Sequence, residues 1–250
     1  MLLGKGQVLS NNQICYLCSR FLKTKTFMKA IFVNGSPRKN KNTALMLESA
    51  LRGAQEAGAE TELAHLYDIQ FQGCKSCFAC KLKDSKTNGI CAIKDDLRPV
   101  LERCRKADVL VFGSPIYYSY PTGMMRSFME RAMFPIGTYH YENGVQKVLR
   151  DKVIPTGMIF TMNCPEDYAA VIHYPFLLET ANSKIMEAIY GHCETLYAYN
   201  TYQFNDYSRY DFTLFSEEEK RLYRDTHWQT DLQNAYQLGK RLVELSKSLS

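Results

Sequence analysis

The chain lacks several patterns that would place it at once in a large protein class. No apolar run in its 250 residues approaches the roughly 18–20 residues that a membrane-spanning helix needs, so we expect a soluble protein. Neither G-x-x-x-x-G-K-[ST] nor G-x-G-x-x-G occurs, which argues against a nucleoside triphosphatase and a dinucleotide-binding Rossmann site. The chain also has no G-x-S-x-G motif, so a hydrolase built on that nucleophile turn is not expected.

Negative charge is missing from the beginning of the chain. No Asp or Glu occurs before Glu48, while residues 1–28 hold four of the 31 Lys and Arg residues. The rest of the chain has 27 basic residues against 26 acidic ones, and this balance gives no argument for binding nucleic acid. Linkers rich in Pro, Gly or Ser and internal repeats are absent too, so we predict one domain over residues 29–250.

Residues 1–28 stand apart in composition. They lack the continuous apolar segment and the small-residue cleavage site of a secretory signal. Two interpretations stay open: an organelle transit peptide, or an upstream extension before a natural start at Met28, which directly precedes the first predicted strand. We predict a poorly ordered leader and a cytoplasmic protein.

The nine cysteines are too sparse for a secreted disulfide scaffold and point to a reducing compartment. Three of them form Cys74-x-x-Cys77-x-x-Cys80, and Cys91 follows. Three thiolates at this spacing can surround one corner of an iron–sulfur cluster. A tetrahedral zinc site and a set of free thiols without a metal are the alternatives. We expect Cys104, Cys164 and Cys193 to behave as small buried hydrophobic residues.

Five short apolar runs alternate with helical patterns along the chain. The runs predict strands at 30–34, 61–66, 107–113, 152–160 and 193–201, the fourth one interrupted by Pro155-Thr156-Gly157. Helices are predicted from about 44 to 58 and at 95–106, 123–132, 169–189, 217–224 and 229–249. Such alternation predicts an α/β fold with a doubly wound, five-stranded parallel sheet of flavodoxin-like order 2-1-3-4-5 and helices on both faces. A mononucleotide binds at the carboxyl ends of strands one and three in that order.

Two loops fall at that position. The first strand is followed by the turn Gly35-Ser36-Pro37-Arg38, and Asn42-Thr43 are predicted to cap the next helix. A turn with a hydroxyl and an Arg before a helix N-terminus is suited to an anion, although an ordinary βα turn is the alternative. The second loop, 114–122, holds two prolines and three tyrosines that offer a flat wall to a ring, or simply pack on a neighbour.

These motifs resemble those of the flavodoxin-like NAD(P)H-dependent FMN reductases, and the cysteines with Asp95-Asp96-Leu97 resemble the iron–sulfur flavoprotein branch of that group. The resemblance implies an FMN phosphate held by Ser36, Arg38, Asn42, Thr43 and the amide of Ala44. It also implies isoalloxazine contacts from Pro115, Ile116, Tyr117, Tyr118 and Ser119, with Gly123 and Arg126 bordering the ring. The loop that starts at Thr161 is the third expected flavin edge.

The same resemblance implies a [4Fe–4S] cluster on Cys74, Cys77, Cys80 and Cys91 that passes electrons to FMN. The sequence departs from the compact pattern because ten residues separate Cys80 from Cys91. It implies an enzyme that takes a hydride from NAD(P)H and reduces a flavin, quinone or other acceptor, as a homodimer or homotetramer. No catalytic side chain is expected because the flavin supplies the chemistry. An electron carrier between partner proteins and a non-catalytic flavin-binding protein are the alternatives.

Overall fold

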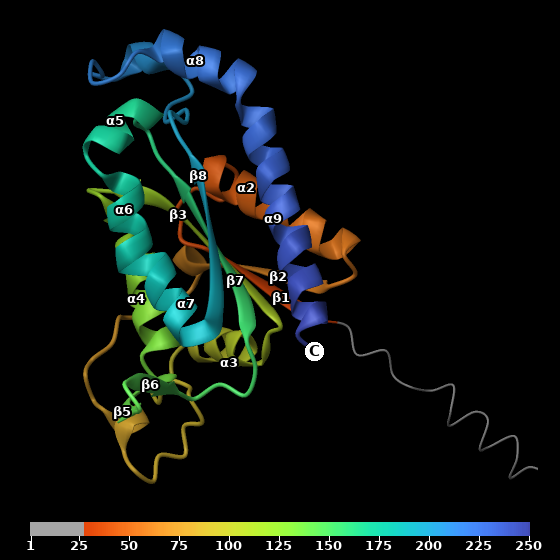
Figure 1. Cartoon of the computed structure of the whole chain (residues 1–250). Helices are drawn as coiled ribbons and strands as arrows, with labels where there is room; N and C mark the ends of the chain where they lie inside the picture. The colour runs from red at the N-terminus through yellow and green to blue at the C-terminus, as the bar shows by residue number, and fades with distance from the viewer. Residues whose placement is uncertain (1–27) are drawn as a thin grey trace, which may run out of the picture.

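The computed structural model of the protein describes residues 28–250, so nearly all of the predicted leader lies outside the described residues. The central sheet has the order β2-β1-β3-β7-β8, and all neighbouring strands in this path are parallel (Figure 1). These strands are Glu60–His65, Lys29–Asn34, Val109–Tyr117, Ile154–Thr161 and Gly191–Ala198, respectively. Taken in chain order they read 2-1-3-4-5, and the predicted flavodoxin-like topology is confirmed.

The middle strands form where the sequence is continuously apolar. Phe32 of β1 and both Val111 and Phe112 of β3 are fully buried, as expected for a sheet that is covered on both faces. The predicted interruption of the fourth strand is wrong, because β7 runs without a break through Pro155. The pairing of β3 with β7 includes Thr156 and the residues after it, so the proline, which has no N–H group, lies before this ladder begins.

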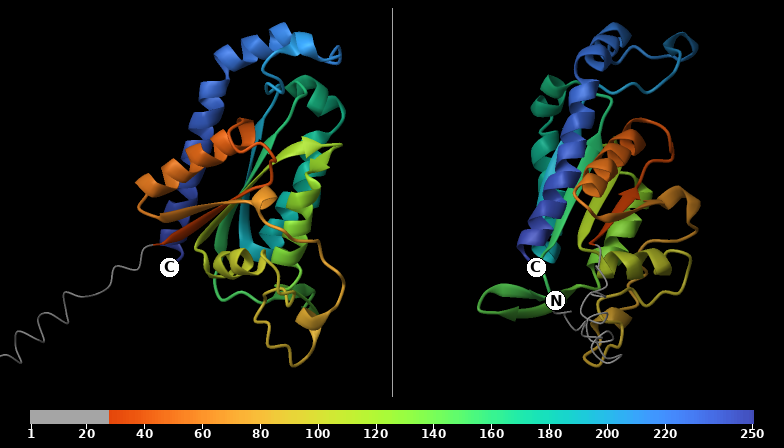
Figure 2. Two further views of the ribbon diagram at one scale, coloured as in Figure 1. Left: turned by 180° about the vertical axis from the view of Figure 1, so that it is seen from behind. Right: turned by 90° about the vertical axis from the view of Figure 1, so that its right-hand side faces the viewer.

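Helices cover both faces of the sheet (Figures 1 and 2). On one face α2 (Asn42–Glu56) packs against α9 (Trp228–Ser248), and α8 (Glu217–Thr226) precedes α9. The other face carries α3 (Arg98–Lys106), α4 (Gly123–Met133) and α7 (Lys184–Tyr190). The contact of α2 with α9 is close because it is made at glycines: a Cβ on Gly239 would lie 1.8 Å from the carbonyl oxygen of Ala50.

The stretch predicted as one helix at 169–189 is broken in the structure. It contains α5 (Glu166–Val171), α6 (Tyr174–Leu178), a π-helical turn (Glu179–Ser183) and α7. His173 separates α5 from α6 with a φ of 58°, and α6 then begins with Pro in its first turn. A proline is accepted in the first turn of a helix but not in its interior, which explains why the pattern cannot continue as one helix.

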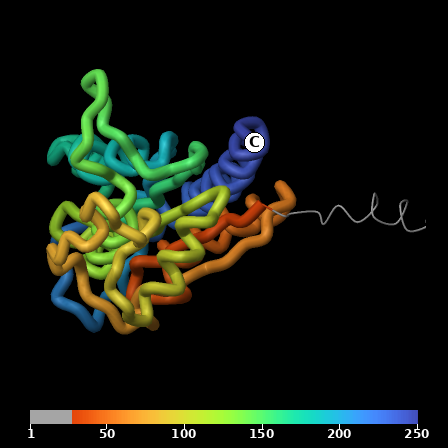
Figure 3. The backbone as a smooth tube through the Cα atoms, turned by 90° about the horizontal axis from the view of Figure 1, so that it is seen from below, coloured from red at the N-terminus to blue at the C-terminus, as the bar shows by residue number. Residues whose placement is uncertain are grey.

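Several smaller elements were not predicted. A hairpin of β5 (Gly137–Glu142) and β6 (Val145–Val148) projects from the body, as the view from below shows (Figure 3). Short 3₁₀ turns lie at Leu66–Asp68, Ala79–Lys81 and Tyr207–Arg209. Among the described residues, no helix combines the length and the apolar character needed to cross a membrane.

Candidate functional site

The loop between β1 and α2 is shaped by local hydrogen bonds. The backbone N–H of Ser36 donates to Oδ1 of Asn34 at 2.9 Å, and the N–H of Arg38 donates to Oγ of Ser36 at 3.1 Å. Asn34 and Ser36 are buried, whereas Arg38 is exposed. The sharp turn brings the chain directly from the end of a central strand to the start of α2.

The N-terminus of α2 differs from the prediction. Lys41 is the N-cap and its side chain makes no capping bond, so Asn42 and Thr43 are helical residues of the first turn rather than caps. The N–H groups of Asn42, Thr43 and Ala44 therefore have no acceptor within the helix. Such N–H groups, together with the positive end of the helix dipole, are what an anion binds.

Side chains at this turn contact a distant segment, residues 202–205, which follows β8. Nδ2 of Asn42 donates to a carbonyl oxygen of the segment at 2.8 Å, and the Arg38 guanidinium donates to another. Nζ of Lys41 donates to a side-chain amide oxygen of the segment at 2.8 Å. A cavity of about 350 Å³ lies here, and its walls are formed by the first turn of α2, this segment and Arg224. Arg224 could not be recognised from the sequence, because it is one of many charged residues in the helix EEEKRLYRDT.

The predicted loop at 114–122 is a tight hairpin. Strand β3 continues to Tyr117 and pairs in antiparallel fashion with β4 (Tyr120–Pro121). The two turn residues, Tyr118 and Ser119, have φ values of 47° and 72°. Positive φ at both central positions matches the right-handed twist of the strands, but it is costly for residues other than glycine. Strained backbone of this kind is concentrated at functional sites in proteins.

The ring-contact residues named above lie along this hairpin. Pro115, Ile116 and Ser119 are half-buried, while Tyr117 is exposed and Tyr118 is 99% exposed. At the far end of the hairpin, Gly123 begins α4 with open space around its α-carbon. The hairpin therefore presents accessible aromatic surface beside an open helix N-terminus.

Thr122, which is not among the predicted site residues, connects the two loops by hydrogen bonds. Its Oγ1 donates to the carbonyl oxygen of Gly35 at 2.7 Å and accepts from the N–H of Met125 at 3.2 Å as the N-cap of α4. Its N–H donates to Oγ of Ser114 at 3.0 Å. A Thr immediately before a helix is a recognised capping signal that was available in the sequence.

The third predicted edge joins the other two at the end of β7. The hydroxyls of Thr43 and Thr161 lie 2.7 Å apart, and both residues are buried. The parallel sheet explains this arrangement, because the carboxyl ends of β1, β3 and β7 lie at one edge. The structure thus brings together the three segments that carry the predicted flavin residues.

The four clustered cysteines line one narrow cavity with a volume of about 10 Å³: Cys74, Cys77, Cys80 and Cys91. All four are free thiols. The long gap before Cys91 is closed because residues 82–90 fold back and return this thiol to the others. Within residues 28–250, no three His, Cys, Asp or Glu side chains come close enough together to hold a single metal ion.

The cysteine loop is strained and anchored to α4. Ser76 and Phe78, on either side of Cys77, have φ values of 50° and 54°. The N–H of Cys74 donates to Oε2 of Glu130 at 3.1 Å. Nζ of Lys81 donates to two backbone carbonyls just after α4, and burial lowers the pKa of this ammonium group. Burial also raises the pKa of the neighbouring Cys80 thiol.

An ion pair between a buried arginine and a half-buried aspartate lies beside the same cavity. The carboxylate of Asp95 accepts two bonds from the Arg131 guanidinium, at 2.5 and 2.8 Å. The hydrogen bonds from Arg131 lower the pKa of Asp95. The sequence does contain a signal for Arg131, since it sits among apolar residues on the buried side of α4.

The hairpin and the cysteine cavity lie at opposite ends of α4. The hairpin leads into Gly123 at its start, whereas Glu130 and Arg131 near its end line the cavity. At 1.5 Å rise per residue, Gly123 and Arg131 are separated by about 12 Å along the helix axis.

The remaining described cysteines do not join the cavity. Cys104 and Cys164 are buried as predicted, whereas Cys193 is only half-buried. Burial raises the pKa of the Cys104 thiol to about 12 and that of Cys193 to about 11. Thiols with such values are poor nucleophiles and poor metal ligands near neutral pH.

The sheet order and the loops at its carboxyl edge define a flavodoxin-like α/β protein. The sequence profile of one family, described as NADPH-dependent FMN reductase, matches residues 28–162, which is more than half of the chain. The chain belongs to this family, as the sequence resemblance indicated. The matched region contains the first two loops of the candidate flavin site, the start of the third at Thr161, and the four clustered cysteines.

Curated relatives include iron–sulfur flavoproteins. One from Archaeoglobus fulgidus is 37% identical over 119 residues, which is 47% of this chain and 56% of that protein. One from Methanocaldococcus jannaschii is 35% identical over 105 residues, or 42% of this chain and 52% of that protein. The chain therefore matches only about half the length of these curated relatives.

Among solved structures, an NAD(P)H:quinone oxidoreductase from Methanothermobacter marburgensis superposes with a TM-score of 0.63. The superposition covers 87% of this chain and 100% of that chain at 14% identity. At this identity the superposition is evidence for the fold alone. It supports the flavodoxin-like fold over most of the described residues.

Proposed function

We propose that the protein is an FMN-dependent oxidoreductase that oxidises NAD(P)H and passes the electrons to a flavin, quinone or other small acceptor. The observation that carries the proposal is the meeting of three loops at the carboxyl edge of the sheet in a chain of the NADPH-dependent FMN reductase family. Phosphate binding at the start of α2 and ring binding at the hairpin are compatible with one FMN spanning both.

In this proposal the chain binds and orients the cofactor. Ser36, Arg38, Asn42, Thr43 and the N–H of Ala44 hold the phosphate. The hairpin from Pro115 to Ser119, with Gly123 and Thr161, surrounds the ring. FMN itself supplies the capacity to accept a hydride and to release electrons, and the protein adds position and electrostatics. The half-buried hairpin leaves one face open for a nicotinamide and then for the acceptor.

The proposal is tested on purified protein by its absorption spectrum, its FMN content and its rate of NADPH and NADH oxidation with flavin or quinone acceptors. Arg38→Ala and Thr43→Val should each weaken FMN binding about tenfold, because each removes a hydrogen-bond donor to the phosphate and Arg38 also removes a charge. Lys39→Ala is the matched control, since Lys39 is an exposed cation of the same loop that pairs with Asp68.

Two results would contradict this site. One is a colourless protein that stays colourless when FMN is added. The other is full FMN affinity in both variants, which would place the flavin elsewhere even if the enzyme were active.

We further propose that Cys74, Cys77, Cys80 and Cys91 hold a [4Fe–4S] cluster. Four free thiols in the wall of one cavity are a suitable donor set, and the nearby cation Arg131 suits their negative charge. Zinc binds thiolates at ~2.3 Å and needs them gathered around one ion. The same four thiolates could serve either metal centre, and the metal content of the protein distinguishes zinc from a cluster.

Iron, sulfide and zinc analysis of anaerobically purified protein tests the cluster. Iron and acid-labile sulfide, with a broad absorption shoulder beside the flavin bands, are expected. Cys77→Ser should lower the iron content, whereas Cys193→Ser, outside the cavity, should not. Zinc without sulfide would support the single-ion alternative instead, and a protein with neither would leave an FMN reductase with free thiols.

The cysteine cavity also favours a second function, that of an electron carrier between partner proteins. A cluster transfers electrons singly, whereas NAD(P)H delivers them in pairs. Stopped-flow reduction distinguishes the two functions. Rapid reduction by ferredoxin without NADH or NADPH oxidation would select the carrier, and steady NAD(P)H turnover would select the enzyme.

We also propose that residues 29–250 act as one domain in a cytoplasmic homodimer or homotetramer. The tight glycine contact between α2 and α9 supports one domain, because it joins the beginning and the end of the described chain. Exposed apolar side chains on α5, α6 and α7, among them Val171 and Phe176, support burial against another copy. Light scattering on the eluted protein measures the assembly size.

A further inference from the structure

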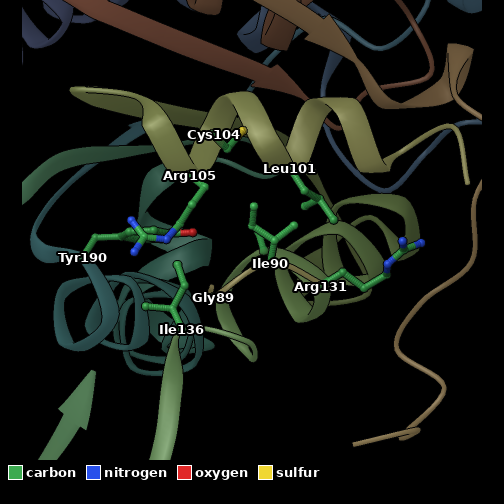
Figure 4. A pocket seen from close by; sticks show the side chains of 9 residues that line it. Gly89, Ile90, Leu101, Cys104, Arg105, Arg131, Ile136 and Tyr190 are labelled. Atoms are coloured by element: carbon green, nitrogen blue, oxygen red, sulfur yellow. The ribbon is translucent and has the colours of Figure 1, made fainter. Parts of the chain in front are cut away.

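Arg131 is a charged residue in an unusual place. It lies on α4 and is 1% exposed, which makes it one of the largest fully buried side chains among the described residues. Its neighbours Phe128 and Ala132 on the same helix are buried too. Figure 4 shows the side chain leaving α4 with its guanidinium group directed away from Tyr190 and Arg105. Burial of a charge is costly, so its partners need an explanation.

The two terminal nitrogens of Arg131 hold both ends of the cysteine loop. Nη1 donates to the carbonyl oxygen of Gln72 at 3.0 Å, two residues before the first clustered cysteine. Nη1 and Nη2 both donate to Asp95, four residues after Cys91, and Nη2 lies 3.5 Å from the carbonyl oxygen of Ile93. One side chain therefore fixes the entry and the exit of a loop that must return Cys91 to the other thiols.

The third guanidinium nitrogen of Arg131 makes no hydrogen bond to the described part of the chain. Nε of Arg131 is buried and has no hydrogen-bond partner within residues 28–250. Arg131 lines the cavity together with the four cysteines. A buried donor without an acceptor, beside four thiols, indicates that a negatively charged group belongs in this cavity.

We propose that Arg131 is a positioning residue for the cluster on these cysteines and that its charge raises the reduction potential of that cluster. The inference rests on the cluster proposed above. Reduction adds one electron, and hence one negative charge, to the cluster and its thiolates. A fixed positive charge in the cavity wall stabilises the reduced form more than the oxidised form. The carboxylate of Asp95 offsets this effect only in part, because Asp95 is not part of the wall.

The loop offers a matched control for the structural part of this role. Nη1 of Arg98 donates to the carbonyl oxygen of Cys91 at 2.8 Å, yet Arg98 does not line the cavity. Arg98→Gln and Arg131→Gln thus each remove an arginine that holds the same loop, but only the second removes a charge from the cavity. A purely structural role would give both variants the same effect.

The experiment is a redox titration of the cluster in the holoprotein, followed by absorbance and electron paramagnetic resonance, with iron and sulfide measured on each sample. Arg131→Gln should shift the midpoint potential to a more negative value, and Arg98→Gln should leave it unchanged. Arg131→Lys, which keeps the charge without the planar fork, should recover part of the shift. An unchanged potential in Arg131→Gln at normal iron content, or equal shifts in both glutamine variants, would overturn the inference.

Asp95→Asn tests the electrostatic role of Arg131 if the Arg131→Gln variant retains too little iron for a redox titration. It leaves the guanidinium charge in place and removes the opposing carboxylate, so the potential should move in the positive direction. A negative or absent shift would refute the electrostatic role. Wild-type protein without iron and sulfide would instead refute the proposed cluster itself, and with it this inference, before any variant is compared.

Discussion

Lys220 should give the protein a characteristic dependence of stability on alkaline pH. This lysine of α8 is fully buried, and its Nζ donates to Oδ1 of Asn200 at 2.9 Å and to the carbonyl oxygen of Asn163. Asn163 lies two residues beyond Thr161, so Lys220 fastens α8 onto the third loop of the candidate flavin site. Burial lowers the pKa of its ammonium group from 10.5 to about 8.

The sign and the size of the effect follow from proton linkage. Between about pH 8 and 10.5 the unfolded chain holds a proton on Lys220 that the folded chain has released, so stability rises with pH in this window. The cost of charging the buried amine is fully present below pH 8 and is removed as the pH approaches 10.5. At 1.36 kcal/mol per pKa unit, this cost is about 3 kcal/mol.

The assay is urea unfolding of the apoprotein at several pH values from 7.5 to about 10.5, for wild type and Lys220→Met. Buried tyrosines and thiols lower the stability in the same range, so the difference between the two proteins is the relevant quantity. The free energy of unfolding of wild type should rise by up to about 3 kcal/mol relative to Lys220→Met. The same substitution at the exposed Lys106 should give no such difference. If the free energy of unfolding changed with pH in the same way in wild type and Lys220→Met, the lowered pKa of Lys220 would be refuted.

Two further predictions concern the packing of α2 against α9 and the dependence of stability on acidic pH. Gly239→Ala should lower the free energy of unfolding by about 2–3 kcal/mol in urea, because the new Cβ would lie 1.8 Å from the backbone oxygen of Ala50 and the helices must separate. Gly123→Ala, which meets open space, should cost nothing in the same assay. Burial raises the pKa of Asp231 to about 6. Between about pH 4 and pH 6 the folded chain therefore keeps a proton on Asp231 that the unfolded chain has lost. The free energy of unfolding consequently falls as the pH rises through this range. Asp231→Asn should abolish this decline in thermal melts, and an unaltered pH profile would show that Asp231 ionises normally.

The sheet order could be predicted because each central strand is a continuous apolar run that is followed by a helical pattern. The run at 107–113, for example, has no alternation, which is what burial on both faces requires. Its extension into the hairpin was missed, since Ser114 and Pro115 are typical of loops and only tertiary pairing keeps them in a strand.

The hairpin β5–β6 was missed for a different reason. Its strands are mostly exposed and carry no apolar face that periodicity detects. Its turn, however, is Asn143-Gly144 with φ values of 53° and 77°, and Asn-Gly is the strongest short signal for such a turn. Turn chemistry was therefore more informative here than hydrophobic pattern.

The site was predictable where function depends on neighbours in sequence and unpredictable where it depends on neighbours in space. The loop from Ser36 to Ala44 and the cysteine spacing are local patterns. The partner of Arg131 is Asp95, 36 residues away, and Arg224 reaches Asn42 from 182 residues away. No spacing rule connects such pairs, because only the folded chain brings them together.

The contacts of residues 202–205 with the start of α2 affect how an anion is accepted. In the described chain the polar side chains of Arg38 and Asn42 are already hydrogen-bonded to backbone carbonyls of this segment. An incoming phosphate therefore competes with an internal ligand and exchanges one set of hydrogen bonds for another, so the net gain per contact is small. The selectivity of this turn for a phosphate then depends on charge, because a phosphate attracts the guanidinium and the helix N-terminus more strongly than a neutral carbonyl does.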